Sequence, residues 1–347
     1  MNTIEQTRAL GQQIWLDNLS RAMIAGGELA AKIAQGVSGQ TTNPAIFLKA
    51  IQNDVSYHSQ IATLQAAGHD AKNCYEILAC QDVQAACDVF AEEHRRHGGD
   101  SGFVSIEVDP AFAHDAAQTV AEALRLHRHI ARENVMIKVP ATNAGITALQ
   151  ELVAHGVCVN MTLIFSRQTL QAIYRAWRSG IEQRLAQGLP IDAIRVVASV
   201  FLSRIDSALD ERLPETLRGQ IALALAKTAY VDWQSAANAA LPVGAVMPSL
   251  LWASTGTKNP NYPDTLYVDN LIGAHTVNTL PEATLAAFLD HGSAAPRLAE
   301  NTDAAAAIWQ ELPKHGIDFE AVAQELQNQG LAQFQAAFAD ILAALAN

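Results

Sequence analysis

The chain has 347 residues, of which 50% are apolar and 17% charged, and its 23 basic and 35 acidic side chains give a net charge of −12. This acidic balance disfavours generic binding to nucleic acid or to anionic lipid, although a few basic side chains in a cleft can still hold a small anion. No apolar run reaches the roughly 18–20 residues that span a bilayer, and the first residues lack the plan of a signal peptide, so we expect no membrane association and a cytoplasmic protein.

Short apolar segments bounded by turn residues alternate along the chain with longer segments of helical periodicity. We predict eight strands, which are Ile14–Asn18, Gly36–Gln40, Phe103–Asp109, Val135–Pro140, Val157–Leu163, Arg195–Phe201, Ser249–Ser254 and Thr265–Asn270. Several of them are apolar at nearly every position, which is typical of a parallel sheet covered on both faces.

Helical segments with apolar residues three or four positions apart lie between these strands. The clearest are Asp115–Ala131, Gly145–His155, Ser166–Gln187 and Glu215–Ala239. Repeated strand–helix units predict an α/β fold, a single (β/α)8 TIM barrel rather than an open sheet. The length of residues 43–102 predicts additional helices after strand 2, whereas the ten residues 255–264 leave no room for a full crossover helix.

No Gly/Ser-rich or Pro-rich linker divides the chain, so we expect residues 1–347 to form a single domain. The C-terminal helices (about 276–347) carry apolar stripes that must bury against the barrel or a partner subunit, and a monomer or a homodimer would satisfy them. Four cysteines fit neither a disulfide scaffold nor a zinc site, and we interpret them as free thiols. They are Cys74, Cys80, Cys87 and Cys158.

Polar side chains recur late in the predicted strands or just after them, where a barrel of this class faces its active site. They are Asp17, Asn43, Glu107, Lys138, Asn160, Thr162, Ser199, Arg204, Ser254 and Lys258. Most of them, taken singly, are equally explained as caps, turn residues or strand ends. Together, the first seven of them, from Asp17 to Ser199, place polar groups at the same end of six of the eight strands, which such explanations do not predict.

Lys138 interrupts the apolar strand VMIKVP. A buried lysine usually loses its proton, and a neutral amine in an apolar site is suited to attack a carbonyl and form a Schiff base. Glu107 lies one strand earlier, at a distance of about 5 Å between neighbouring strands, and could hold a water or carry protons. The alternatives are a lysine that extends from the strand end into solvent, and a glutamate that forms a salt bridge with a neighbouring lysine.

Arg204 and Lys258 form a basic pair near the ends of strands six and seven, where barrels often hold a phosphate. Arg204 could instead pair with Asp206 or Asp210 on the following helix. The chain has no glycine-rich nucleotide motif and no metal-ligand motif, so we expect no cofactor and no metal.

At these residues the sequence resembles the transaldolase family, specifically its longer bacterial subfamily. The matching motifs, in chain order, are IWLDNLSR, TTNPAIF, FVSIEVDP, MIKVPAT, VNMTLIFS, VVASVFLSRID, LLWASTGTKNP and YPDTLYVDNLIGAHTVNTLP. They cover essentially the whole chain in the family's order.

The resemblance implies a cofactor-free enzyme of the pentose phosphate pathway that acts on sugar phosphates. It implies transfer of a dihydroxyacetone unit from sedoheptulose 7-phosphate or fructose 6-phosphate to glyceraldehyde 3-phosphate or erythrose 4-phosphate. Lys138 then matches the Schiff-base lysine, and Asp17 matches the acid/base that takes the proton of the donor's C4 hydroxyl. Glu107 and Thr162 match the residues that position a catalytic water.

The same resemblance assigns the substrate contacts. Asn43, Asn160 and Ser199 match residues that bind the dihydroxyacetone portion, and Arg204 matches the phosphate-binding arginine. Lys258, and Ser254 in the same loop, are further candidates for substrate binding. Two alternatives remain open at this point, namely an aldolase that cleaves fructose 6-phosphate and releases free dihydroxyacetone, and a barrel that binds sugar phosphate without turnover.

Overall fold

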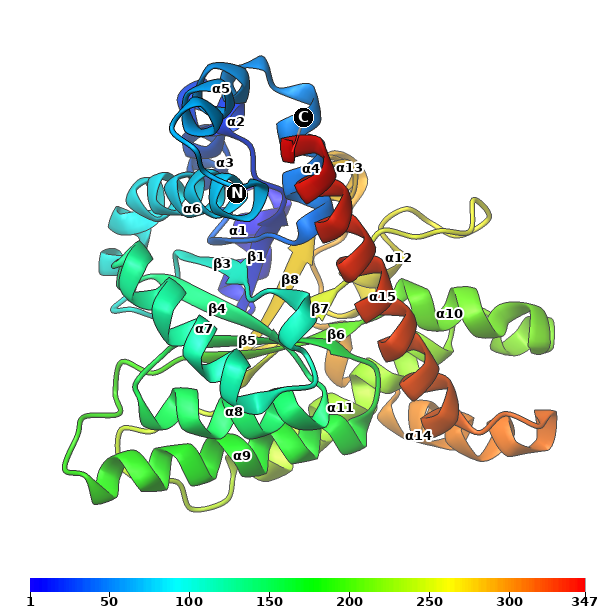
Figure 1. Cartoon of the computed structure of the whole chain (residues 1–347). Helices are drawn as coiled ribbons and strands as arrows, with labels where there is room; N and C mark the ends of the chain where they lie inside the picture. Colours follow the sequence, from blue (N-terminus) through cyan, green and yellow to red (C-terminus); the bar gives the residue numbers. More distant parts are fainter. Residues whose placement is uncertain (347) are drawn as a thin grey trace.

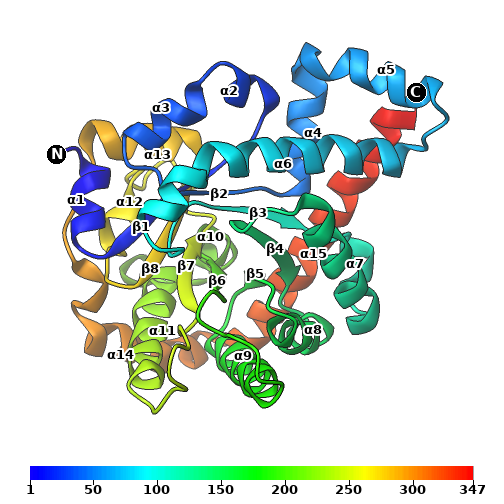
Figure 2. The same ribbon diagram turned by 90° about the vertical axis from the view of Figure 1, so that its left-hand side faces the viewer.

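A computed structural model describes residues 1–346 and shows a closed barrel of eight parallel strands in sequential order, surrounded by helices (Figures 1 and 2). The strands are β1 (Gln12–Asp17), β2 (Gly39–Thr41), β3 (Phe103–Glu107), β4 (Val135–Pro140), β5 (Val159–Ile164), β6 (Val196–Phe201), β7 (Ser249–Ala253) and β8 (Thr276–Leu280). The ring closes where β8 pairs with β1. The predicted (β/α)8 barrel is therefore confirmed.

Seven of the eight predicted strands lie within a few residues of an observed one, but the eighth prediction was wrong. Residues Leu266–Asn270 form the short helix α12, in which the side chain of Thr265 donates to Asp269 one turn later. The last strand is instead Thr276–Leu280, because only this segment pairs with both β7 and β1. The crossover from β7 to β8 therefore carries no full-length helix, although it is longer than predicted.

Helices alternate with the strands along the chain, and additional helices are present after β2 and at the C-terminus. The α-helices are α1 (Thr3–Ala9), α2 (Arg21–Ala25), α3 (Glu28–Ala34), α4 (Pro44–Asn53), α5 (His58–Ala66), α6 (Ala71–Arg96), α7 (Ala116–Ile130), α8 (Asn143–Ala154), α9 (Arg167–Ala186), α10 (Ser203–Leu209), α11 (Ile221–Ala237), α12 (Leu266–Asn270), α13 (Glu282–His291), α14 (Thr302–Glu311) and α15 (Phe319–Ala346). The short 3₁₀ helices are η1 (Val55–Tyr57), η2 (Pro110–Phe112), η3 (Asp210–Arg212), η4 (Glu215–Leu217), η5 (Arg297–Ala299) and η6 (Leu312–His315).

Short polar residues at the strand-to-helix turns fix where the helices begin. Asn43, Thr142 and Ser166 are the N-caps of α4, α8 and α9, and each accepts a hydrogen bond from a backbone N–H in the first turn. Such caps satisfy backbone donors that have no partner inside the helix. The turns are thereby held at the carboxyl end of the barrel, where the polar side chains of the strands also emerge.

Both faces of the strands are buried. Every residue of β4, β5 and β6 is buried, which explains why these segments are apolar at nearly every position. The side chains of Trp15, Trp177 and Trp252 are among the largest fully buried ones. All four cysteines are buried free thiols, and burial raises the pKa of Cys80 and Cys87 to about 12, so they are held as unreactive thiols.

The helices at the C-terminal end begin at Glu282 rather than at about 276, because residues 276–280 are β8. The last of them, α15, contacts α4, α6, η2, β5 and α10. It therefore crosses the carboxyl ends of several strands, as the red helix in Figure 1 shows. Among the described residues, no helix is long and apolar enough to cross a membrane.

Candidate active site

A cavity of about 230 Å³ opens at the carboxyl ends of the strands. Eight of the ten candidate residues from the sequence line it, and these are Asp17, Asn43, Lys138, Thr162, Ser199, Arg204, Ser254 and Lys258. They come from β1, β4, β5, β6 and the segments that follow β2, β6 and β7. The closed barrel thus gathers residues that are far apart in the sequence around one small space.

Lys138 is the buried basic group of this cavity. Its strand pairs with β3 so that Lys138 lies beside Glu107, and the Lys138 Nζ is 3.4 Å from Glu107 Oε2. The Nζ also donates a hydrogen bond of 2.9 Å to the carbonyl of Thr42. Lys138 is only 5% exposed, so the alternative of a lysine that extends into solvent is wrong.

Glu107 is buried beside this amine, and its charge is poorly solvated. Burial raises the pKa of Glu107 to about 7; the positive charge of Lys138 opposes this rise, and the Asp17 carboxylate adds to it. Within the part of the chain that the structure describes, neither carboxylate oxygen of Glu107 makes a hydrogen bond of normal geometry, and the buried Thr162 hydroxyl likewise has no partner. A carboxyl group with a pKa near neutrality can accept and return a proton at physiological pH.

Asp17 ends β1 on the other side of the cavity. Its Oδ1 accepts a hydrogen bond of 2.7 Å from the Thr41 hydroxyl, which is itself 2.7 Å from the Thr279 hydroxyl. Burial raises the pKa of Asp17, and the charge of Lys138 opposes the rise. The hydroxyl pair therefore orients the carboxylate of Asp17, which lines the cavity.

A second group of hydrogen bonds connects β3, β5 and β6. The Ser199 hydroxyl donates to Asn160 Oδ1 at 2.7 Å, and Asn160 Nδ2 donates to the Ser105 hydroxyl at 3.1 Å. Asn160 is fully buried and lies beside Lys138 in the strand register. Its amide therefore fixes the rotamer of Ser199, which lines the cavity. Asn160 and Glu107 are the two candidates that contact wall residues without lining the wall themselves.

The basic groups lie at the rim formed by the segments after β6 and β7. The Arg204 guanidinium is half-buried, 5.2 Å above the Phe201 ring, and burial lowers its pKa. Within residues 1–346 it makes no ion pair. Asp206 and Asp210 accept hydrogen bonds from Tyr267 and Tyr262 instead, so the predicted alternative pairing with Arg204 is wrong.

Lys258 is exposed at the same rim, and the Ser254 and Ser203 hydroxyls are 2.9 Å apart. Ser254 has a φ of 54°, a left-handed conformation that turns the chain sharply after β7. An unpaired arginine with a nearby lysine favours an anionic group on whatever binds in the cavity.

Several wall residues carry no signal in the sequence that singles them out. Thr41, Phe201, Thr279, Gln333 and Phe334 also line the cavity. Thr41 and Thr279 follow the alternation of their strands, but a threonine in a strand is common. Gln333 and Phe334 belong to α15, and no local pattern reveals that a helix so far along the chain crosses the barrel mouth.

Comparison with known proteins gives a consistent result. The model of the family described as Transaldolase/Fructose-6-phosphate aldolase matches residues 14–345. The chain is 55% identical to a transaldolase of Neisseria gonorrhoeae over 99% of this chain and 100% of that protein. It is 42% identical to a transaldolase of Thiobacillus denitrificans over 99% of both chains. It is also 41% identical to transaldolase 1 of Streptomyces avermitilis over 99% of this chain and 96% of that protein.

Proposed function

Because the chain belongs to the transaldolase and fructose-6-phosphate aldolase family, we propose that its barrel cavity transfers a dihydroxyacetone unit between sugar phosphates through a Schiff base on Lys138. The protein is an enzyme of the transferase class, a transaldolase. In this proposal the donor is sedoheptulose 7-phosphate or fructose 6-phosphate, and the acceptor is glyceraldehyde 3-phosphate or erythrose 4-phosphate, as in the non-oxidative pentose phosphate pathway.

The observation that carries the proposal is that Lys138, which lines the cavity together with Asp17, is paired with the buried Glu107. The Lys138 nitrogen attacks the ketose carbonyl, and loss of water gives a protonated imine. In this step the neutral amine loses one proton, and the carbonyl oxygen gains two protons, one from the nitrogen and one from a proton donor, so that it leaves as water. Glu107 is 3.4 Å from the nitrogen and has a pKa near 7, so it is suited to move these protons, directly or through a water held with Thr162.

Asp17 acts in the next step. Its carboxylate takes the proton from the C4 hydroxyl of the bound ketose, the C3–C4 bond breaks, and its electron pair moves into the protonated imine to give an enamine. The aldose leaves, and the dihydroxyacetone unit stays on Lys138. The reverse sequence with a second aldehyde completes the transfer, and Asp17 returns the proton to the new hydroxyl.

Polar groups around the cavity hold the substrate in place. We assign Asn43, Ser199 and Asn160 to the hydroxyl groups of the dihydroxyacetone portion, with Asn160 also fixing Ser199. Arg204 binds the phosphate, since it is half-buried in the cavity wall and has no other charged partner among the described residues. Lys258 and Ser254 are secondary contacts at the rim. The proposal requires no cofactor and no metal, because the lysine itself supplies the electron sink.

The experiment that tests this function is a transfer assay with purified protein. Fructose 6-phosphate and erythrose 4-phosphate should give sedoheptulose 7-phosphate and glyceraldehyde 3-phosphate, with little free dihydroxyacetone. Abundant dihydroxyacetone from fructose 6-phosphate alone would indicate an aldolase instead. Binding of fructose 6-phosphate with neither product would indicate a barrel that binds without turnover.

A further inference from the structure

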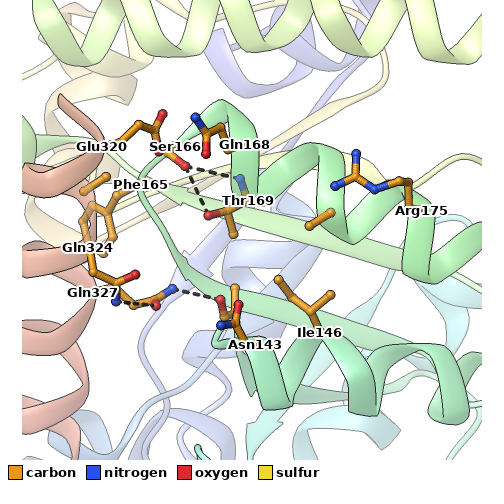
Figure 3. A pocket seen from close by; sticks show the side chains of 13 residues that line it. Asn143, Ile146, Phe165, Ser166, Gln168, Thr169, Arg175, Glu320, Gln324 and Gln327 are labelled. Atoms are coloured by element: carbon orange, nitrogen blue, oxygen red, sulfur yellow. Dashed lines mark hydrogen bonds between the residues drawn. The ribbon is translucent and has the colours of Figure 1, made fainter. Parts of the chain in front are cut away.

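The C-terminal helix α15 is attached to the two strands that carry Lys138 and Thr162. The Gln327 side-chain amide donates to the carbonyl of Ala141, just after β4, at 2.9 Å, and to the carbonyl of Leu163, in β5, at 3.1 Å. Figure 3 shows Gln327 directed from the helix toward these segments, at the edge of a neighbouring polar pocket between α8, α9 and α15. One side chain of α15 thus donates hydrogen bonds to backbone carbonyls at the ends of both strands.

The helix backbone lies unusually close to the barrel one turn later. A Cβ atom at Gly330 would lie 2.7 Å from Leu163 Cδ2 and 3.2 Å from Arg204 Nη1. Leu163 itself has a φ of 59°, and the pairing of β5 with β6 shifts register between Met161 and Ile164. The absence of a side chain at Gly330 therefore lets α15 approach this irregular strand end closely.

Phe334 lies two turns beyond Gln327 on the same helix. Its ring centroid is 5.5 Å from Lys138 Nζ, and the residue is only 6% exposed. Phe334 lines the cavity from the side of the helix, whereas Glu107 lies on the neighbouring strand. The reactive nitrogen therefore has a proton-carrying group on the barrel side and an apolar ring on the side of α15.

We propose that Phe334 determines how the lysine-bound dihydroxyacetone unit is partitioned, by shielding it from bulk water so that it is transferred to an aldehyde rather than hydrolysed. This inference rests on the proposed function, because it concerns the intermediate on Lys138. It adds a specificity-determining residue on α15, outside the set of polar groups at the strand ends.

The competing reaction needs only water. The enamine carbon takes up a proton to give the protonated imine, water adds to the imine carbon, and the carbon–nitrogen bond breaks. The products are free dihydroxyacetone and the regenerated Lys138 amine. A ring that covers the nitrogen from the mouth of the barrel slows this reaction by limiting the access of water, since closure of an active site suppresses hydrolysis of reactive intermediates.

The test measures the ratio of free dihydroxyacetone released to sedoheptulose 7-phosphate formed, by NMR, at fixed concentrations of fructose 6-phosphate and erythrose 4-phosphate. We expect Phe334→Ala to raise this ratio severalfold relative to the unmodified enzyme. Phe334→Leu keeps apolar bulk at the same place and should give a ratio near that of the unmodified enzyme. An impaired cleavage step alone would lower both products together and leave the ratio unchanged.

The matched control is Phe338→Ala on the same helix. The Phe338 ring packs edge-on against Tyr75 at 5.2 Å between centroids and does not line the cavity, so its removal loosens the packing of α15 without uncovering Lys138. Borohydride trapping with fructose 6-phosphate is run on every variant to show that the intermediate forms on Lys138.

Three results would overturn the inference while leaving the proposed function intact, provided that the trapped adduct is present. They are an unchanged ratio in Phe334→Ala, an equal rise in Phe338→Ala, and a Phe334→Leu variant that releases as much as Phe334→Ala. Absence of the adduct from the unmodified enzyme would instead contradict the proposed function itself.

Discussion

Glu107 illustrates how burial prepares a residue for proton transfer. The sequence shows a glutamate in an apolar strand, and the barrel places it beside Lys138, where its two carboxylate oxygens have no hydrogen-bond partner among residues 1–346. Burial then raises its pKa to about 7. The residue that accepts a proton from the attacking amine must be ionised, which links the rate directly to this pKa.

We predict that kcat falls as the pH drops below about 7, because the Glu107 carboxyl then holds its proton and cannot accept another. Glu107→Gln should lower kcat by about 10²–10⁴-fold and remove this inflection from the pH profile. A pH series of initial transfer rates measures both effects, with the exposed Glu92→Gln as the control. An inflection near pH 7 that persists in Glu107→Gln would assign it to another group.

Arg204 and Lys258 differ in burial, and we expect the more buried side chain to contribute more to substrate binding. We predict that Arg204→Ala raises KM for fructose 6-phosphate by roughly 10–100-fold, since a charge-assisted hydrogen bond in a partly buried site contributes about 1.5–3 kcal/mol. Lys258→Ala should have a smaller effect, because Lys258 is exposed to solvent. Unphosphorylated fructose is the comparison substrate. If Arg204→Ala raised KM for fructose as much as KM for fructose 6-phosphate, the result would argue against a phosphate contact.

The strand-end positions of most site residues could be inferred from the sequence, because a polar residue late in an apolar strand contrasts with its neighbours. Lys138 and Glu107 are the clearest cases. Phe334 and Phe201 could not be singled out, because an aromatic residue on an amphipathic segment is usually a core residue. Only the path of the chain in space shows that both lie on the cavity wall.

At the scale of the elements, α15 completes the site from outside the barrel. Its contacts run from α4 across β5 to α10, so it joins segments that follow different strands. The close approach at Gly330 lets it pack against Leu163 and Arg204. The position of the Arg204 side chain therefore depends on a helix that is distant from it in sequence.

We predict that Gly330→Ala raises KM for fructose 6-phosphate, because the added methyl group must displace Leu163 or Arg204. Alanine has a higher helix propensity than glycine by about 1 kcal/mol. This gain partly cancels the loss from crowding in the free energy of unfolding, so KM is the more informative readout. The exposed Asn328→Ala on α15 serves as the control. An unchanged KM in Gly330→Ala would show that the helix can shift without moving Arg204.

The eighth strand shows why element boundaries were not all predictable. Both LYVDN and TVNTL are short, partly apolar segments after the turn at Pro263, and local preference does not decide between them. Pairing with β1 decides, since it closes the barrel and involves five residues of β8. This pairing depends on the closed ring of strands, so the sequence of either segment by itself does not reveal it.

At the scale of the whole molecule, the charges are distributed unevenly. The chain carries a net charge of −12, yet Arg204 and Lys258 both line the cavity that contains Lys138. A local positive group in a cleft can attract a phosphate ester even on an acidic protein, because the field near the site is dominated by the nearest charges.

Global stability should also depend on pH through Asp206, which lies outside the cavity. Burial raises its pKa from 3.8 to about 6, although hydrogen bonds from Ala222 and Tyr267 oppose the rise. The folded state then binds this proton more tightly than the unfolded state, so the free energy of unfolding decreases as pH rises from about 4 to 6.

We predict that the free energy of unfolding of Asp206→Asn, relative to that of the unmodified protein, increases as pH rises through this range. The increase should reach up to about 3 kcal/mol, since one pKa unit corresponds to about 1.4 kcal/mol. Denaturant unfolding at pH 4 and pH 7 measures the change, and the exposed Asp340→Asn on α15 controls for net charge. A difference between Asp206→Asn and the unmodified protein that is the same at both pH values would contradict the raised pKa.

The proposed function depends most directly on covalent chemistry at the Lys138 nitrogen. Sodium borohydride added together with fructose 6-phosphate should reduce the imine and leave a stable dihydroxyacetone adduct, which peptide mass spectrometry locates. We predict that the adduct lies on Lys138 and that Lys138→Ala shows neither adduct nor transfer. An adduct on another lysine, or undiminished transfer by Lys138→Ala, would contradict it.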